Sequence, residues 1–202
     1  MTRMDLVTFL ANDVADSVLK TTRLSKYTSS TSGSDYYWAL KKGAAKVFLD
    51  GLSYDQAVSV VMSNMTVPHQ RSHNQLALKA LYSWKLANPG EPLDPPIGAF
   101  AGPKGELIIK LEPAFGLCIK GKKTAFVPWP LKDFRLNAKV AGMGIYLLEQ
   151  GLKKGDYADW KFCMIDLVSG DVFNRTHKDT AKAVDFALRT QEELLISFKD
   201  AA

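Results

Sequence analysis

The chain has 202 residues, of which 47% are hydrophobic and 23% charged, a composition typical of a globular protein and too apolar for a disordered one. It contains no run of about 18 apolar residues, and polar residues interrupt the apolar stretch near the N-terminus, so we predict neither a membrane span nor export. The two cysteines, Cys118 and Cys163, each stand in an apolar run, which indicates buried thiols in a cytoplasmic protein.

The net charge of +5 comes from one segment. Residues 104–139 contain eight Lys or Arg and three Asp or Glu residues, whereas the rest of the chain carries 18 of each kind. A local positive excess is what a polyanionic partner requires, although lysines on hairpins also protect exposed sheet edges from association.

The first 87 residues predict helices. Apolar residues spaced three and four apart indicate one helix over about the first 25 residues and a second over residues 35–50, which ends at Gly51. Between them, Thr28–Ser34 has the Ser, Thr and Gly composition of a flexible connector.

Two further helices are predicted in this half. Ser53 and Gln56 have the spacing of a capping box, and Pro68 suits the first turn of a longer helix that extends to about Ala87. The pair resembles a helix-turn-helix in outline, although other helical hairpins are far commoner and the turn lacks the usual glycine. Its second helix would present base-contacting residue types, namely Gln70, Arg71, His73 and Asn74.

A Pro-rich segment, Asn88–Lys104, holds five of the nine prolines. Because proline removes a backbone donor and fixes φ, we expect neither a helix nor a strand to run through this segment. It predicts the main boundary of the chain, either as a linker or as an ordered arm over a sheet. The predicted organisation is a helical region at residues 1–87, a connector at residues 88–104 and an α+β domain at residues 105–202.

After the connector the hydrophobic period changes from about 3.6 to about 2, which predicts strands. Alternating apolar residues and turns at Gly121 and Ser169–Gly170 predict five strands, with helices at residues 136–150 and from about Thr176. The element order is β-β-β-α-β-β-α. We therefore predict an α+β fold, with a helical N-terminal half followed by a mixed, mostly antiparallel five-stranded sheet with flanking helices.

Motifs for catalysis or metal binding are incomplete. His69 and His73 have the spacing of a zinc-binding helix, but Gln70 stands where that motif needs a glutamate as general base. The sequence has no Gly-rich phosphate loop at a strand-to-helix turn and no serine in a nucleophile elbow. We therefore predict no metal, no cofactor and no catalytic residues, and we do not expect an enzyme.

The order α-β-β-β-α-β, counted from the helix at residues 70–87, is similar to the core of restriction-endonuclease-like folds. That resemblance implies an Asp on the second core strand and Glu-x-Lys on the third, which together hold a divalent ion. The corresponding strands here, AFGLCIK and TAFVPW, contain no acidic residue. A protein of this kind would be inactive, unless Glu106, Glu112 and Asp166 formed a divergent metal site.

The segment KLEPAFGLCIKGKKTAFVPWP is a predicted hairpin that carries lysines and ends in a tryptophan between prolines. Lysines at its turn could reach phosphates, and the tryptophan could stack on a base. The alternative is that the lysines protect a sheet edge and the tryptophan packs in the core. The candidate nucleic-acid contacts are Lys120, Lys122, Lys123, Trp129 and Arg135.

These patterns favour a non-enzymatic binding or adaptor protein with an unknown protein partner, whose amphipathic terminal helices could also support a homo-oligomer. Nucleic-acid binding through the basic hairpin is the alternative hypothesis, and a divergent or inactive nuclease is the second alternative.

Overall fold

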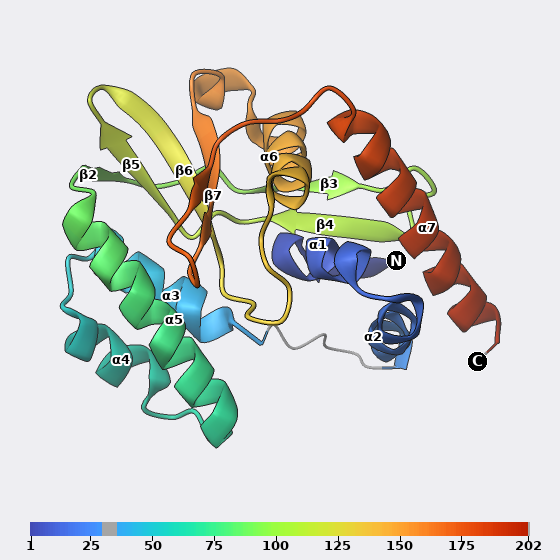
Figure 1. Ribbon diagram of the computed structural model, residues 1–202, viewed down its shortest axis with the longest axis horizontal. Coiled ribbons are helices and arrows are strands. Elements are labelled where there is room, and N and C mark those ends of the chain that lie inside the picture. Colours follow the sequence, from blue (N-terminus) through green and yellow to red (C-terminus); the bar gives the residue numbers. More distant parts are fainter. Residues whose placement is uncertain (30–35, 202) are drawn as a thin grey trace.

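The computed structural model describes residues 1–29 and 36–201, and it confirms the α+β fold (Figure 1). Most of the predicted connector at residues 28–34 lies outside the described residues. In the described part of the chain, no helix is both long and apolar enough to cross a membrane.

Seven α-helices and one short 3₁₀ helix occur within the described ranges. They are α1 (Leu6–Val14), α2 (Ser17–Ser29), α3 (Trp38–Phe48), α4 (Tyr54–Met62), α5 (Pro68–Ala87), α6 (Ala138–Leu152), η1 (Gly155–Tyr157) and α7 (Thr180–Asp200). The capping box is confirmed: the Ser53 side chain accepts the N–H of Gln56 at 3.3 Å, and the Gln56 side chain accepts the N–H of Ser53 at 2.9 Å. Pro68 stands in the first turn of α5, as predicted.

The strands form two sheets. The smaller sheet has the order β1-β4-β3, from strands β1 (Thr2–Asp5), β4 (Leu107–Leu111) and β3 (Gly98–Ala101). The larger sheet has the order β2-β5-β6-β7-β8, from strands β2 (Glu91–Leu93), β5 (Phe115–Ile119), β6 (Lys122–Trp129), β7 (Lys161–Asp166) and β8 (Val172–Phe173). The larger sheet is mixed, because only its β6–β7 pair is parallel.

The N-terminus differs from the prediction of one helix over the first 25 residues. Residues Thr2–Asp5 form a strand that pairs in parallel with β4, about a hundred residues away along the chain. The Met4 side chain of this strand is buried in the core. The helical part is also divided, because the chain leaves α1 at Ala15 in an extended conformation. The partner strand lies far along the chain, so local apolar spacing could not reveal the pairing.

The Pro-rich segment contains strands, so the expectation that none would run through it is wrong. β2 and β3 lie within residues 88–104 and pair with β5 and β4 respectively. Pro92 is accommodated because β2 is an edge strand, where a missing backbone donor costs least. The division of the chain into separate units at this segment stays a prediction.

One long, bent hairpin connects the two sheets. In both the β2–β5 and the β3–β4 pairings, the residue numbers of the partners add up to the same total, so the hairpin keeps one register across the break. The break falls at residues 112–114, which include Pro113. As a result β4 leaves the larger sheet, where the sequence had placed it, and β2 supplies the fifth strand.

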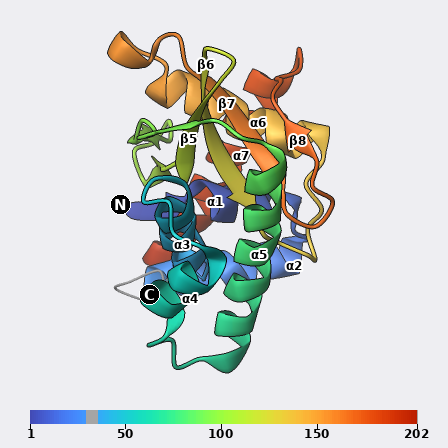
Figure 2. The same ribbon diagram turned by 90° about the vertical axis from the view of Figure 1, so that its left-hand side faces the viewer.

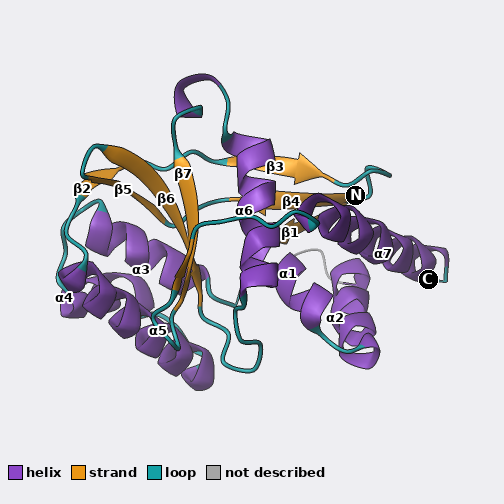
Figure 3. Ribbon diagram, turned by 45° about the horizontal axis from the view of Figure 1, so that its top comes forward, coloured by secondary structure: helices purple, strands orange, loops and turns teal. Residues whose placement is uncertain are grey.

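Helices cover both faces of the larger sheet. On one face, α3, α4 and α5 pack side by side (Figure 2). Phe48 of α3 stacks there on Phe115 of β5, with 3.6 Å between the ring centroids. On the other face, α6 packs against β7 and also against β3 and β4, so it fills the angle between the two sheets (Figure 3). Gly144 allows this approach, since a Cβ there would collide with the Met164 sulfur.

Candidate ligand-binding cavity

The carboxyl ends of both parallel strand pairs meet at one place. The pair β6 and β7 ends at Trp129 and Asp166, and the pair β1 and β4 ends at Asp5 and Leu111. At each of these four ends, the last strand residue or a residue one or two positions beyond it lines the same cavity. Ligands of α/β sheets commonly bind in the crevice outside the carboxyl ends of parallel strands.

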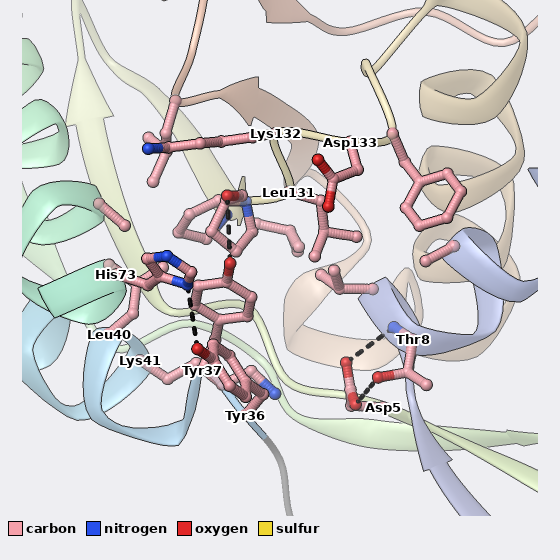
Figure 4. Close-up of a pocket in the computed structure, with 18 of the residues that line it drawn as sticks. Asp5, Thr8, Tyr36, Tyr37, Leu40, Lys41, His73, Leu131, Lys132 and Asp133 are labelled. Atoms are coloured by element: carbon pink, nitrogen blue, oxygen red, sulfur yellow. Dashed lines mark hydrogen bonds between the residues drawn. The ribbon is translucent and has the colours of Figure 1, made fainter. Parts of the chain in front are cut away.

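The cavity has a volume of about 1090 Å³ (Figure 4). Besides the strand ends and the loop after β6, its wall is one face of each of four helices, α1, α2, α3 and α5. Each helix contributes residues three or four positions apart, such as Arg23 and Tyr27 from α2 and His73 and Ala77 from α5. The volume is slightly above the usual range for pockets that hold small organic ligands, roughly 300–1,000 Å³.

Two adjacent tyrosines are fixed at the wall of this cavity. Tyr36 and Tyr37 make an edge-to-face ring contact with 5.0 Å between centroids. A 3.0 Å hydrogen bond joins the Tyr36 hydroxyl to Nδ1 of His73, and the Tyr37 hydroxyl donates to the backbone oxygen of Pro130 at 3.4 Å (Figure 4). Burial, with a smaller effect from Tyr36 and Asp133, raises the pKa of Tyr37 to about 12. Burial also raises the pKa of Tyr36, so both phenols are neutral at ordinary pH.

Asn12 on α1 is the most deeply buried polar residue of the cavity wall, with 0% of its surface exposed. Among the described residues, its Nδ2 donates to one atom, the Met4 sulfur at 3.5 Å, which is a weak acceptor. Its Oδ1 has no hydrogen-bond partner among the described residues. Leaving a buried amide oxygen without a donor costs free energy.

Charges around the cavity nearly balance. The basic lining residues are Arg23, Lys26, Lys41 and Lys132, and the acidic ones are Asp5, Glu112 and Asp133. Asp5 is engaged at the start of α1, where it accepts the N–H of Thr8 at 3.0 Å and its hydroxyl at 2.5 Å. The Arg23 guanidinium lies over the Phe134 ring at 4.8 Å.

The structure separates the candidate nucleic-acid contacts. Lys120, Lys122 and Lys123 lie at the turn between β5 and β6, whereas Arg135 follows the other end of β6, in the yellow loop before α6 (Figure 1). At about 3.3 Å per residue, the two ends of β6 lie roughly 23 Å apart. Lys120 and Lys122 are exposed, but Lys123 makes a 3.0 Å ion pair with Asp159.

Trp129 is buried and not exposed as a surface on which a base could stack. Its side chain is 0% exposed, and its indole N–H donates to the backbone oxygen of Phe134 at 2.6 Å. The residue belongs to the core cluster that also contains Leu136 and Val140 from the start of α6. Because the ring has no exposed face, a base cannot stack on it in this structure.

Polar residues of the predicted helix-turn-helix, which corresponds to α4 and α5, also make hydrogen bonds within the protein. Asn74 is fully buried: its Oδ1 accepts the N–H of Leu40 at 2.8 Å, and its Nδ2 donates to the backbone oxygens of Tyr36 and Gln70. Gln70 donates to the Tyr36 oxygen as well, at 2.9 Å. These side chains hold α5 against the start of α3 and are not presented to a partner.

The carboxylates of the divergent metal site are spread over the molecule. Glu106 pairs with Lys199 and the N-terminal amine, Glu112 lines the cavity, and Asp166 is buried at the end of β7. Oδ1 of Asp166 accepts the N–H of Val168 at 2.8 Å, so this group closes its own turn. No cluster of three or more His, Cys, Asp or Glu side chains that could hold a metal occurs in residues 1–29 and 36–201.

Sequence reasoning missed the cavity because its wall comes from seven or more separate elements. Polar residues directly after predicted strands, such as Glu112, are a usable signal, but the apolar spacing of the first residues predicts a helix in place of β1. No family model, no curated protein and no solved structure matches this chain.

Proposed function

We propose that this protein binds a small organic molecule in the cavity at the strand ends. The observation that carries the proposal is the convergence of the carboxyl ends of both parallel strand pairs on a cavity of about 1090 Å³. The sequence favours a non-enzymatic binding protein, and the proposal adds the kind of ligand, a small organic molecule, and the place where it binds.

The lining has the chemistry of a binding site for such a molecule. Apolar side chains from several elements supply contact area, among them Val7, Leu40 and Val127. A few oriented polar groups accompany them, and the Tyr36–His73 hydrogen bond keeps two of these in place. Ligand pockets combine a mainly apolar and aromatic lining with a small number of such groups, which fix the orientation of the ligand.

A ligand-observed NMR screen of a small-molecule fragment library tests the proposal, with a matched pair of variants on one helix. Leu76 lines the cavity from α5 and is 51% exposed, whereas Leu86 on the same helix is 68% exposed and does not line it. We expect Leu76→Trp to reduce binding of the fragments found with the native chain by at least about tenfold, because the larger ring occupies the cavity. Leu86→Trp should leave binding unchanged. Equal binding to both variants, or no fragment bound, would contradict the proposal.

Nucleic-acid binding remains a second candidate, favoured by one observation. The Lys123–Asp159 ion pair holds the β5–β6 turn beside the connection from α6 to β7, and both lie at the top in Figures 1 and 2. The exposed lysines of these two segments are Lys120 and Lys122 in the turn and Lys154 and Lys161 in and beside the connection.

This second candidate predicts salt-dependent binding of mixed DNA or RNA, since phosphate contacts release counterions. Changing both Lys120 and Lys122 to Glu should abolish that binding, whereas Arg135→Glu, at the opposite end of β6, should not. Fluorescence anisotropy at low and moderate salt measures both. Unchanged affinity in the double variant would exclude this surface.

A further inference from the structure

We propose that His69 and His73 bind a divalent transition metal ion of the kind that imidazole prefers, namely Cu²⁺, Ni²⁺ or Zn²⁺, and that Tyr36 orients His73 for this role. This metal site is separate from the proposed function and does not depend on it. Gln70 stands where a metalloprotease has its general base, which speaks against catalysis, but binding of an ion needs no such base.

The two histidines share one face of α5. They stand four positions apart in the first two turns of the helix, so their side chains are neighbours on its surface, with about 5–6 Å between Cβ atoms. Both residues are exposed. Among the described residues, one hydrogen bond engages this pair, at Nδ1 of His73, and it leaves a nitrogen of each ring to bind an ion.

Tyr36 is held beside both histidines by side chains of α5. Its backbone oxygen accepts hydrogen bonds from Gln70 at 2.9 Å and from Asn74 at 3.0 Å, and its hydroxyl is bonded to Nδ1 of His73 at 3.0 Å (Figure 4). The Tyr36 ring also lies nearly parallel to the His69 ring, with 6.2 Å between the centroids and 27° between the planes. These contacts restrict both imidazoles before an ion binds, which lowers the entropy cost of binding.

The hydrogen bond to Tyr36 favours the form of His73 that binds a metal. A neutral imidazole has one N–H and one nitrogen lone pair, and a tyrosine hydroxyl can accept as well as donate. When Nδ1 of His73 donates to the Tyr36 oxygen, the lone pair is on Nε2. This is the usual state of a histidine ligand, whose second nitrogen donates to a neighbouring acceptor that fixes the tautomer and the ring orientation.

Two imidazoles also select the class of metal. Nitrogen ligands suit Cu²⁺, Ni²⁺ and Zn²⁺, whereas Mg²⁺ and Ca²⁺ require oxygen ligands. The remaining coordination positions of the ion stay open to water or to a bound molecule. Because His73 also lines the cavity, the ion would lie at the edge of the proposed ligand site.

Isothermal titration calorimetry of the native chain without a histidine tag tests the metal site. We expect one ion per chain, with Cu²⁺ bound more tightly than Ni²⁺ or Zn²⁺ and no binding of Mg²⁺. His69→Ala and His73→Ala should each weaken Ni²⁺ binding by at least about tenfold, because one imidazole alone remains. His177→Ala is the matched control, since His177 is exposed but lies outside α5, and it should bind as the native chain does.

The role of Tyr36 has its own variant. Tyr36→Phe keeps the ring and removes the hydroxyl, so we expect about tenfold weaker binding, the usual cost of losing a partner that orients a ligand. Tyr37→Phe, which removes the neighbouring hydroxyl bonded to Pro130, should leave the affinity unchanged. In the diamagnetic Zn²⁺ complex, the imidazole ¹⁵N shifts of His73 should show Nε2 on the metal and the proton on Nδ1. Coordination through Nδ1, or full affinity in Tyr36→Phe, would overturn the orienting role.

Full Ni²⁺ affinity in either single-histidine variant, or no Ni²⁺ binding by the native chain, would overturn the metal site itself. Both positions are exposed and alanine favours a helix, so the variants should fold, and circular dichroism without metal checks this. The fragment screen with Leu76→Trp contains no metal, so failure of the metal site and failure of the proposed function are read from different experiments.

Discussion

Three buried side chains carry an oxygen atom without a hydrogen-bond partner in the described residues, namely Asn12, Asp166 and Gln191. Gln191 and Asp166 each use another atom in the fold: the Gln191 amide donates to the Phe9 oxygen at 3.0 Å, and Asp166 accepts from Val168. Within the described part of the chain, the Asn12 amide makes one weak contact, with the Met4 sulfur, and Asn12 is the one of the three that lines the cavity. Each of the three side chains is thus held within the fold by its other polar atom.

Residue type alone predicts such roles poorly. Trp129 and Asn74 are residue types that stack on bases or contact their edges, yet both are fully buried and hold neighbouring segments in place. In contrast Ser53, Gln56 and Pro68 were predicted correctly, because capping depends on neighbours within one turn of the chain. Burial depends on partners that are distant in sequence.

Cys163 gives the protein an alkaline limit of stability. Burial, opposed by Lys161, raises the pKa of its thiol from 9.0 to about 11. The unfolded chain therefore loses this proton at lower pH than the folded chain does. The contribution of this thiol to the free energy of unfolding is complete below about pH 9 and is lost as the pH rises towards 11. A shift of two units corresponds to roughly 3 kcal/mol at most.

We predict that Cys163→Ala flattens this pH dependence. Denaturant unfolding at intervals between pH 8 and pH 11 should show a smaller loss of stability in the variant than in the native chain. The raised pKa of Tyr37 adds to the alkaline loss in both proteins and cancels in the comparison. Parallel curves for the two proteins would show that the Cys163 thiol is not the group responsible.

At the scale of elements, α7 is joined to the β3–β4 turn by a buried carboxylate. Glu192 is 0% exposed and accepts three backbone N–H groups, from Lys104 at 2.9 Å, Glu106 at 2.9 Å and Leu107 at 3.1 Å. Gly102 lies against the same carboxylate, where any Cβ would collide with it. Three donors from the turn thus offset the cost of burying this charge.

Glu192→Gln tests this connection, with its neighbour as the control. The amide keeps one oxygen but presents an N–H to the turn where the carboxylate accepts, so we expect a loss of about 2–4 kcal/mol in the free energy of unfolding. Glu193 is exposed and pairs with Lys104 at 3.1 Å on the surface, so Glu193→Gln should cost less than about 0.5 kcal/mol. Urea unfolding measures both values, and similar losses in the two variants would refute the structural role of Glu192.

For the whole molecule, the sequence predicts the α+β class and most of the helices and strands, but not how the strands divide between two sheets. Alternation identified residues 107–111 as a strand, yet a single bend at residues 112–114 transfers it to a second sheet with β1. The bend and the parallel partner are both long-range features, and the cavity depends on both. This is why the candidate site could not be located from motifs.

The N-terminal strand is therefore the strongest test of the whole arrangement. Deletion of residues 1–4 removes β1 from the β4 edge and takes away Met4, which is 1% exposed, while Asp5 remains to cap α1. We expect a loss of at least about 3 kcal/mol in stability, since a buried side chain and most of a strand pairing are removed together. Binding of fragments in the cavity should weaken as well, because Asn12 contacts Met4 directly.

Arg3→Ala serves as the control, because Arg3 lies on the same strand with its side chain exposed and should change stability by less than about 0.5 kcal/mol. Urea unfolding and the fragment screen together measure the two variants. If the first residues were a helix lying on the surface, as apolar spacing alone suggests, the deletion would cost little and leave the cavity intact. A large loss in the deletion, with none in Arg3→Ala, would place the N-terminal strand inside the fold and tie the cavity to it.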